Sequence, residues 1–322
     1  MSHPITDVFP AAILDELVDV ESRLQHQADS RVETLTDWTA EPLGAGGKRI
    51  RPLLLLTAFH ACGGDRLGPD ARSQAMDAAV AIELVHTASL VHDDLMDQSS
   101  ERRGRPSTYA AHGVDGAILV GDFLFTQAFA LAATLPKEAL DLTADACRRL
   151  CEGQLREQTF QRSGSRDKAT YLAIIADKTS ALLAAACGIG AVMARAGPST
   201  VDAMHRYGRA IGNAFQILDD VLDVAGDPRW TGKPVGTDYL AGTMSSPFLN
   251  HLERGGELPH ERDIKDFPKV REELFDNGSV AVSQMEAATH TQAALLEISH
   301  LPRSPARAAL EHLAELLMER AT

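Results

Sequence analysis

Two copies of one short acidic pattern interrupt apolar, helix-like stretches of this 322-residue chain. The copies read Asp93-Asp94-Leu95-Met96-Asp97 and Asp219-Asp220-Val221-Leu222-Asp223. On a helix, carboxylates at positions i, i+1 and i+4 project close together and repel one another. Such oxygen ligands suit Mg²⁺ that is bound together with substrate phosphates. The pattern therefore predicts two helices that each end in a carboxylate cluster, with a Mg²⁺-diphosphate as the ligand.

The composition favours an all-α fold. Hydrophobic residues make up 44% of the chain and aromatic residues only 5%. Ala and Leu are abundant and β-branched runs are scarce, which is typical of packed helices rather than of a sheet. We expect one domain over residues 1–322, built as a bundle of about ten or more helices.

Charge and local composition exclude several classes of protein. The formal net charge of -14 argues against nucleic-acid binding, which normally needs a basic face. The four cysteines have no CxxC pairing and are expected to be reduced thiols. The first ten residues do not resemble a signal peptide, and no uninterrupted apolar run reaches the roughly 20 residues of a membrane span. We therefore expect a cytoplasmic protein without a membrane span.

Apolar periodicity predicts a series of helices with short breaks that contain Gly, Pro or Ser. The expected helical stretches cover about residues 11–40, 52–61, 73–97, 116–135, 137–158, 168–195, 200–224 and 280–316. Residues 53–61 are apolar nearly all round, so this helix is expected in the middle of the bundle. Both acidic patterns close a helix and precede a loop that is basic or rich in Gly.

A second phosphate signal stands in Gly46-Gly47-Lys48-Arg49-Ile50-Arg51-Pro52. Glycines let the backbone approach an anion. We expect Lys48 and Arg51 one helical turn apart, where both side chains can bind one diphosphate without metal. The GxxxxGK[ST] spacing of a Walker loop is absent.

With these motifs the chain resembles the trans-isoprenyl diphosphate synthases, the family that makes farnesyl, geranylgeranyl and longer polyprenyl diphosphates. The resemblance covers about residues 44–247. It is carried by the two acidic patterns and by segments 46–52, 83–92, Arg102-Arg103-Gly104, Gly121-Asp122, Lys178-Thr179, Phe215-Gln216 and Gly232-Lys233-Pro234. The resemblance implies a helical bundle around a central elongated cavity and a condensation of isopentenyl diphosphate with an allylic diphosphate.

The resemblance also implies residue roles. The isopentenyl diphosphate head group is expected to contact Lys48, Arg51, His86 and Arg103. Two or three Mg²⁺ ions on the allylic diphosphate are expected to bind Asp93, Asp97 and Asp219, with Asp94 and Asp223 as partial or indirect ligands. The allylic diphosphate is expected to contact Arg102, Lys178 and Lys233, and the residues near the developing positive charge are Thr179 and Gln216. His92 is expected to be a packed histidine.

Product length in this family depends on what blocks the cavity below the first acidic pattern. The residues above that pattern are small: Ser89, Ala88 and, one turn deeper, Val85. We therefore expect products of geranylgeranyl length or longer, with Phe123, Phe125 or Phe129 as the floor. The chain departs from many relatives at Gly242-Thr243-Met244, where a Lys contact is missing, and residues 253–276 fit the family poorly.

Two other functions remain open from the sequence. A class I terpene cyclase, or another ionising enzyme of the same fold, would use Mg²⁺ without condensing isopentenyl diphosphate. Such an enzyme has no need of the Lys48, Arg51, His86 and Arg103 pocket. A non-catalytic regulatory subunit would show eroded acidic patterns, and both are intact. The resemblance implies a homodimer, with a product that partitions into membranes.

Overall fold

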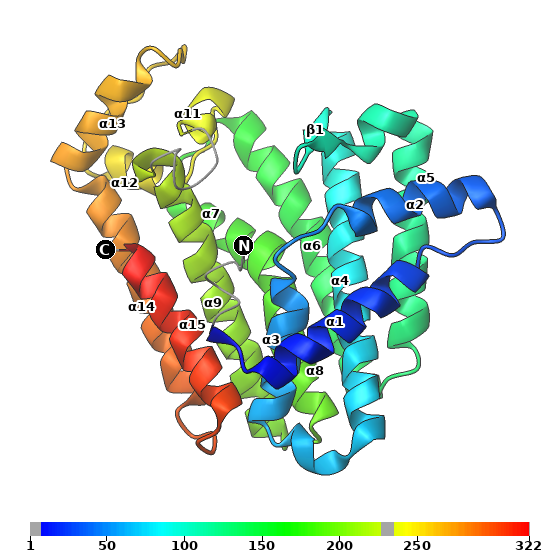
Figure 1. Ribbon diagram of the computed structural model, residues 1–322. Coiled ribbons are helices and arrows are strands. Elements are labelled where there is room, and N and C mark those ends of the chain that lie inside the picture. The colour runs from blue at the N-terminus through cyan, green and yellow to red at the C-terminus, as the bar shows by residue number, and fades with distance from the viewer. Residues whose placement is uncertain (1–7, 227–234, 322) are drawn as a thin grey trace. The chain divides into compact units, whose positions relative to one another are not determined.

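The computed structural model describes residues 8–226 and 235–321, with side chains up to residue 317, and these ranges are mainly helical (Figure 1). Within them, the one sheet is a two-stranded antiparallel hairpin of β1 (Glu101–Arg102) and β2 (Arg105–Pro106). The prediction of an all-α fold is confirmed.

The chain divides into two compact units. Unit 1 comprises residues 1–147, 185–205 and 300–310, and unit 2 comprises residues 148–184, 206–299 and 311–322. The first acidic pattern belongs to unit 1 and the second to unit 2. The expectations of one domain over 1–322 and of a central elongated cavity stay predictions.

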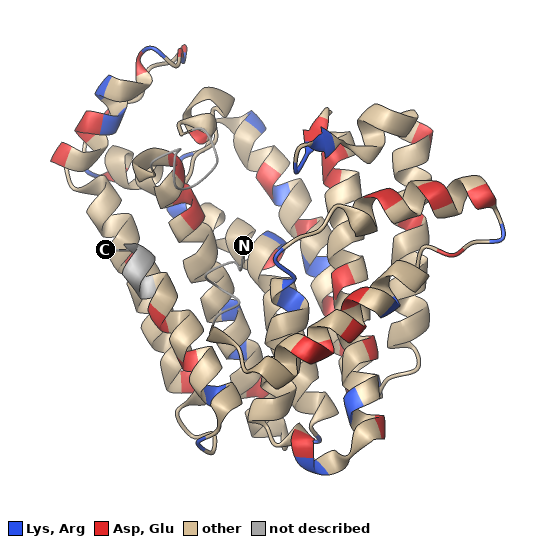
Figure 2. Ribbon diagram, in the orientation of Figure 1, with Lys and Arg blue, Asp and Glu red and all other residues tan. Residues whose placement is uncertain are grey.

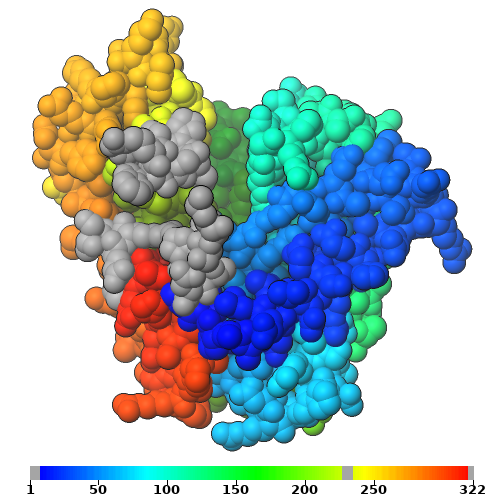
Figure 3. Space-filling view, viewed as in Figure 1, coloured from blue at the N-terminus to red at the C-terminus, as the bar shows by residue number. Residues whose placement is uncertain are grey.

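Unit 1 is built on a long pair of helices. Its elements are α1 (Ala11–His26), α2 (Glu33–Gly44), α3 (Ile50–Ala61), the 3-10 helix η2 (Gly64–Leu67), α4 (Pro69–Met96) and α5 (Thr108–Ala132). α4 and α5 pack against each other, while α1 contacts α3 and α4 at the surface (Figures 1 and 3). The prediction of one helix over 11–40 was wrong, because the chain breaks after α1 and restarts at extended Val32.

The predicted central helix of unit 1 is confirmed as a buried one. In α3, every residue from Pro52 to Ala61 is buried. α4 begins with Pro69 at its first turn, which suits a residue without an N–H donor, and its buried side is rich in alanine. Small side chains let neighbouring helices approach closely, so α4 is held firmly along its length up to the acidic pattern.

Unit 2 surrounds the end of the second motif helix. Its own elements are α7 (Lys168–Ile175), the π-helical turn η3 (Ala176–Ser180), α11 (Thr237–Ala241), α12 (Ser246–Glu253), α13 (Phe267–Asp276) and α14 (Ser279–Ile298). Four helices contribute residues to both units: α6 (Lys137–Ser163), α8 (Ala181–Met193), α9 (Pro198–Ala225) and α15 (Pro305–Ala321). The core of unit 2 includes Val221 and Val224 of α9 packed with Tyr239, Phe248 and Phe267.

Two stretches are long and apolar enough to cross a membrane by length and composition alone. They are Thr108–Ala132, whose most apolar window is 33% buried, and Lys168–Met193, whose window is 78% buried. Core helices of soluble proteins meet the same test. Neither is an uninterrupted apolar run, since Asp122 lies in the first and Lys178 in the second.

Candidate active site

The first acidic pattern lies at the carboxyl end of α4. The helix ends at Met96, and Asp97 is its C-terminal cap. Asp93 is half-buried and Asp97 is exposed. Asp94 is buried and accepts two hydrogen bonds from Arg102, from Nε at 2.7 Å and from Nη2 at 2.6 Å. This bidentate pair fastens the β1–β2 hairpin to the end of α4, so the role of Asp94 as a partial metal ligand stays a prediction.

The hairpin turn places two neighbouring arginines in different surroundings. Arg103 and Gly104 both have positive φ angles, as a tight type I′ hairpin turn requires. The Arg103 guanidinium donates to the carbonyl oxygen of Gly46. A Cβ atom at Gly47 would lie 2.8 Å from that guanidinium, which explains a glycine there. Figure 2 shows the basic positions gathered at this hairpin.

A group of three basic side chains, the cationic cluster, is formed by Arg51, His86 and Arg103. Burial, together with the nearby Arg51 and Arg103, holds the pKa of His86 well below its usual value. Burial and the neighbouring Arg103 lower the pKa of Arg51, and burial lowers that of Arg103. The Arg51 Nε atom is buried without a hydrogen-bond partner among the described residues. An anion bound here would satisfy both the charge and the donor.

One carboxylate, Glu83, lies beneath the cationic cluster. It is buried and accepts from Arg49 at 2.9 Å, and its other oxygen has no partner among the described residues. Arg49 also donates to Glu21 and to the Leu43 carbonyl oxygen, and it has a left-handed backbone with φ 47°.

The left-handed backbone of Arg49 corrects the prediction for Lys48. α3 begins at Ile50, after the left-handed Arg49, so Lys48 is an exposed residue of the preceding loop. The expectation of Lys48 and Arg51 one turn apart on a helix was therefore wrong. The ion pairs of Arg49 redirect the chain just before the helix starts.

The predicted chain-length residues lie on two different sides of α4. Val85 and Ala88 are fully buried, whereas Ser89 is partly exposed and donates to the His86 carbonyl oxygen at 2.8 Å. Phe123 on α5 is partly buried.

His92 is a packed histidine, as predicted. Its ring centroid lies 5.8 Å from that of Phe125, and its Nε2 lies 3.7 Å from Asp122. A Cβ at Gly121 would stand 2.1 Å from the same ring, so only glycine leaves room for it. This contact fixes α4 against α5 directly before the first carboxylate.

The carboxylates of unit 1 fit a magnesium ion that is shared with phosphate. Across the described residues, no three His, Cys, Asp or Glu side chains converge as a ready-made metal site. Mg²⁺ commonly takes only one or two carboxylates and completes its shell with water and substrate phosphates. Half-buried Asp93 and exposed Asp97 are oxygen donors of that kind. A cavity of about 250 Å³, lined in part by Asp94, Arg102 and Arg103, adjoins this end of α4.

In the second acidic pattern the three carboxylates have different environments. Asp219 is exposed. Asp220 is buried, and burial raises its pKa to about 6 although three donors act against this. Asp223 accepts from the Thr237 hydroxyl and from the backbone N–H groups of Thr237 and Asp238, at 3.1 and 3.0 Å. Asp223 therefore caps α11, which leaves its role as a metal ligand a prediction.

A fourth carboxylate, Asp238, joins this group, and the sequence analysis did not include it. Burial, together with the nearby Asp220 and Asp223, raises the pKa of Asp238 to about 8. Its backbone N–H donates to Asp223, which explains how a residue beyond the second pattern reaches the cluster. The negative charge crowded here favours a bound cation.

The π-helical turn η3 presents two of the predicted substrate-binding residues. Lys178 donates to Glu157 of α6. Thr179 donates to Gln216 Oε1 at 2.9 Å, so the two residues expected near the developing positive charge are in direct contact. A Cβ at Gly153 would lie 2.7 Å from the Lys178 backbone nitrogen, which shows how tightly α6 packs against the turn. Single π-helical turns often occur at functional sites.

These residues line one cavity of about 280 Å³ in unit 2. Its walls include Glu157, Phe160, Gln161, Tyr171, Ile174, Ile175, Lys178, Thr179, Gln216, Asp220, Asp238, Thr243, Met244 and Ser245. Thr243 and Met244, the positions where a family lysine is missing, thus line the same cavity. Lys233 lies outside the described residues.

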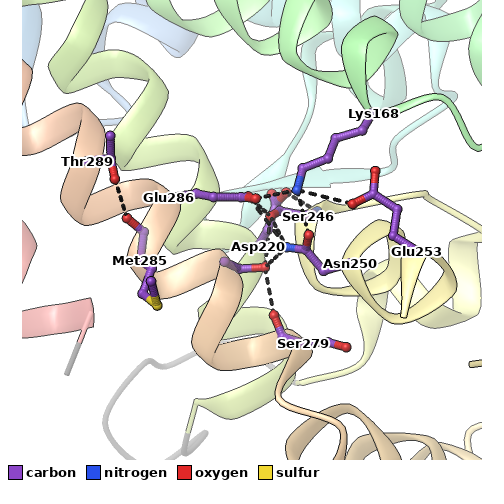
Figure 4. Close-up of polar contacts among 10 residues, drawn as sticks. Lys168, Asp220, Ser246, Asn250, Glu253, Ser279, Met285, Glu286 and Thr289 are labelled. Atoms are coloured by element: carbon purple, nitrogen blue, oxygen red, sulfur yellow. Dashed lines mark hydrogen bonds and ion pairs between the residues drawn. The ribbon is translucent and has the colours of Figure 1, made fainter. Parts of the chain in front are cut away.

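A buried polar network lies behind Asp220 (Figure 4). The Ser246 backbone N–H donates to Asp220 Oδ2 at 3.0 Å, and the Ser246 hydroxyl lies within hydrogen-bonding distance of both Ser283 and Glu286. Lys168 donates to Asn250 at 2.5 Å and pairs with Glu286. The network joins α7, α12 and α14 to the second acidic pattern.

Three comparisons with known proteins give one answer. A model of the family described as "Polyprenyl synthetase" matches residues 32–271. A short chain isoprenyl diphosphate synthase of Methanothermobacter thermautotrophicus is 38% identical over 95% of this chain and 99% of its own length. A nonaprenyl diphosphate synthase of Mycobacterium tuberculosis is 34% identical over 97% and 95%. A polyprenyl synthase from Caulobacter crescentus, solved with calcium and isoprenyl diphosphate, matches at TM-score 0.87 and 32% identity over 100% and 99%.

Proposed function

This chain belongs to the polyprenyl synthetase family, and we propose that it condenses isopentenyl diphosphate with an allylic diphosphate into an all-trans geranylgeranyl or longer prenyl diphosphate. It is a prenyltransferase, since the relatives that cover nearly all of the chain are named as prenyl diphosphate synthases. The cationic cluster of Arg51, His86 and Arg103 is the observation that carries the choice of condensation, because only condensation needs a second diphosphate pocket.

The cationic cluster binds isopentenyl diphosphate without metal. The Nε atom of Arg51 is a buried donor without a partner in the part of the chain that the structure describes, and Arg103 lies near it, so a diphosphate would relieve their mutual repulsion. Neutral His86 adds an N–H donor without adding charge. Lys48, exposed on the preceding loop, completes the head-group contacts.

Magnesium acts with the carboxylates on the allylic diphosphate. We assign Asp93 and Asp97 in unit 1 and Asp219 in unit 2 to two or three Mg²⁺ ions, with Asp94 and Asp223 in supporting roles. Bound Mg²⁺ supplies charge neutralisation to the departing diphosphate. Arg102, Lys178 and Lys233 supply donors to the same group.

The reaction then depends on how the protein stabilises positive charge. As the allylic carbon–oxygen bond breaks, Thr179 and Gln216 direct oxygen atoms towards the developing cation. The alkene of isopentenyl diphosphate attacks this carbon, and loss of a proton restores an allylic double bond. Binding both substrates in fixed pockets supplies the orientation.

The terpene cyclase and the regulatory subunit are not favoured. A cyclase binds a single diphosphate and gives no reason for the cationic cluster. A regulatory subunit gives no reason for the crowded carboxylates of unit 2.

Products of geranylgeranyl length or longer follow from the small residues before Asp93. Ala88→Phe should shorten the product, as should Ser89→Phe. Because Ala88 is fully buried, a ring there overpacks the core around α4 and costs about 1–3 kcal/mol of folding free energy. Ser89 is partly exposed and accepts the ring more easily. Unchanged product length in a folded Ser89→Phe protein would contradict this part of the proposal.

Assembly as a homodimer is part of the proposal. α5 exposes an apolar face with Val114, Ile118, Leu119 and Phe129, which are between 39% and 55% exposed. A second copy of the chain would cover this face and remove it from water. Ile118→Glu should then yield a monomer in sedimentation experiments. A cytoplasmic location, with a product that partitions into membranes, completes the proposal.

Incubation with labelled isopentenyl diphosphate, Mg²⁺ and one allylic diphosphate at a time tests the proposed function. Dimethylallyl, geranyl, farnesyl and geranylgeranyl diphosphates serve as primers, and the products are separated by chain length. Elongated products are expected. Consumption of the allylic substrate without incorporation would support the cyclase, and absence of turnover with every primer would support the regulatory subunit.

A further inference from the structure

The buried carboxylate of Asp220 accepts hydrogen bonds from three protein donors. Its Oδ2 atom accepts from the Tyr171 hydroxyl at 2.6 Å and from the Ser246 N–H at 3.0 Å. Its Oδ1 atom accepts from Gln216 Nε2 at 3.0 Å. Asp219 beside it is exposed, whereas Asp220 is 5% exposed. Two adjacent carboxylates of one pattern therefore have different environments.

The contact to Gln216 fixes which end of its amide faces which neighbour. An ionised carboxylate only accepts hydrogen bonds, so it selects the NH₂ end of the amide. The carbonyl end then accepts from the Thr179 hydroxyl at 2.9 Å. Because the Thr179 hydroxyl uses its one proton in this hydrogen bond, its oxygen can face the unit 2 cavity only as an acceptor.

On this basis we infer that Tyr171 and Asp220 are positioning residues, which orient the Gln216 amide and the Thr179 hydroxyl so that both present oxygen to the allylic carbon as it becomes positive. The inference rests on the proposed function. It separates Asp220 from its neighbour Asp219, because Asp220 acts through Gln216 and Asp219 acts on the metal.

The surroundings keep this chain of bonds in place. Tyr171 is buried on α7, and the backbone of Ser246 starts α12. The Ser246 hydroxyl is tied to Ser283 at 2.8 Å and to Glu286 at 3.2 Å, and Lys168 pairs with Glu286 (Figure 4). Asp220 is thus held from two helices other than its own, as a positioning group must be.

Tyr171→Phe tests the inference, since it removes one hydroxyl and keeps the ring. We expect kcat to fall about tenfold. The KM values of both substrates and the Mg²⁺ concentration at half-maximal rate should stay within about twofold. Tyr239→Phe is the matched control, because the Tyr239 hydroxyl is buried in the same unit without a partner among the described residues. Its kcat should not change.

A double-mutant cycle separates positioning from general stability. In a Gln216→Leu background no amide remains to be oriented, so Tyr171→Phe should lower kcat less than about twofold further. The same tenfold loss in both backgrounds would overturn the inference, as would a raised Mg²⁺ requirement or an unchanged kcat in Tyr171→Phe alone.

One readout does not depend on turnover. In protein labelled with ¹⁵N-glutamine, the side-chain amide signal of Gln216 is the one that Gln216→Leu removes. Tyr171→Phe and Asp220→Asn should shift that signal and Tyr239→Phe should not. An unshifted signal would overturn the inference even in an active enzyme, whereas wild-type protein without elongation activity would reject the proposed function and leave this result intact.

Discussion

Burial shifts pKa values in the cationic cluster of unit 1 and in the carboxylate cluster of unit 2, which is formed by Asp219, Asp220, Asp223 and Asp238. In unit 1, burial and neighbouring arginines lower the pKa values of His86 and Arg51. In unit 2, burial and neighbouring aspartates raise the pKa of Asp238 to about 8. In each region the folded chain brings like charges together at a cost in folding free energy.

The difference in the sign of the charge determines how each cluster could bind a diphosphate. A positively charged cluster can bind a diphosphate directly, because its donors and its charge both suit the anion. A negatively charged cluster repels the same anion and can take part only through a cation. The account therefore makes one diphosphate independent of metal and the other dependent on it.

The largest expected effect is at Asp219. Asp219→Asn should lower kcat about 1,000-fold, since it removes the charge of a proposed ligand of the ion that would stabilise the leaving group. Steady-state rates over a range of Mg²⁺ concentrations measure this loss. Asp202→Asn, also an exposed position of α9, is the control and should keep full activity. If Asp219→Asn retained most of its rate, the carboxylate cluster would not be a metal site.

The second-largest expected effect concerns Arg103 of the cationic cluster. Arg103→Gln should raise the KM for isopentenyl diphosphate about 10- to 100-fold, because one charge-assisted hydrogen bond is lost. The allylic KM should change little. Arg105→Gln lies two positions along the same hairpin, is exposed, and serves as the control. An equal rise in both KM values would show that Arg103 does not distinguish the two diphosphates.

Removing a stored charge should stabilise the protein while it damages function. Arg51→Met and Asp238→Asn each relieve burial of an unpaired charge or a crowded carboxyl, so the ligand-free midpoint of thermal unfolding should rise by about 2–5 °C. Added Mg²⁺ should stabilise Asp238→Asn less than the wild type. A lowered midpoint in both variants would mean that these groups are compensated in the folded protein.

The smallest effect concerns a charge in unit 1 that is already paired. Burial lowers the pKa of His60, but hydrogen bonds to Glu16, at 2.7 Å, and to Asp65 outweigh it, so the pKa is raised. Protonated His60 therefore stabilises the folded protein. This stabilisation is fully present below the pKa of the unfolded state, near 6.5, and is lost as pH rises through the higher pKa of the folded state.

The test for His60 is the free energy of unfolding in urea between about pH 6 and pH 9. His60→Gln should be less stable than the wild type by about 1 kcal/mol at the acidic end, with the difference shrinking as pH rises. A difference that grew with pH would contradict the pairing.

Helix content and the two acidic patterns could be predicted from the sequence because they rest on local periodicity. α3 and α4 follow from apolar spacing and from Pro69, which starts a helix. The break between α1 and α2 was missed, because its apolar spacing resembles a continuing helix. The π-helical turn η3 was missed as well, since it depends on close packing against Gly153 and Gly212.

Only those site residues that belong to a recognisable sequence motif could be predicted. Thr179 and Gln216 were each expected near the developing positive charge, and the structure shows that they share a hydrogen bond. Tyr171 and Asp238 carry no motif of their own, because tertiary contacts alone bring them to Asp220 and Asp223. The position of Tyr171 seven residues before Lys178 was the available signal, since this spacing is about two helical turns.

Calorimetric titration of the wild-type protein tests most directly whether one diphosphate binds without metal while the other requires it. Isopentenyl diphosphate and a non-ionisable allylic diphosphate analogue are each titrated in EDTA and then in Mg²⁺. The account predicts that isopentenyl diphosphate binds in both buffers with affinities within about twofold, whereas the analogue binds measurably only with Mg²⁺. Isopentenyl diphosphate binding that required Mg²⁺, or analogue binding that did not, would contradict it.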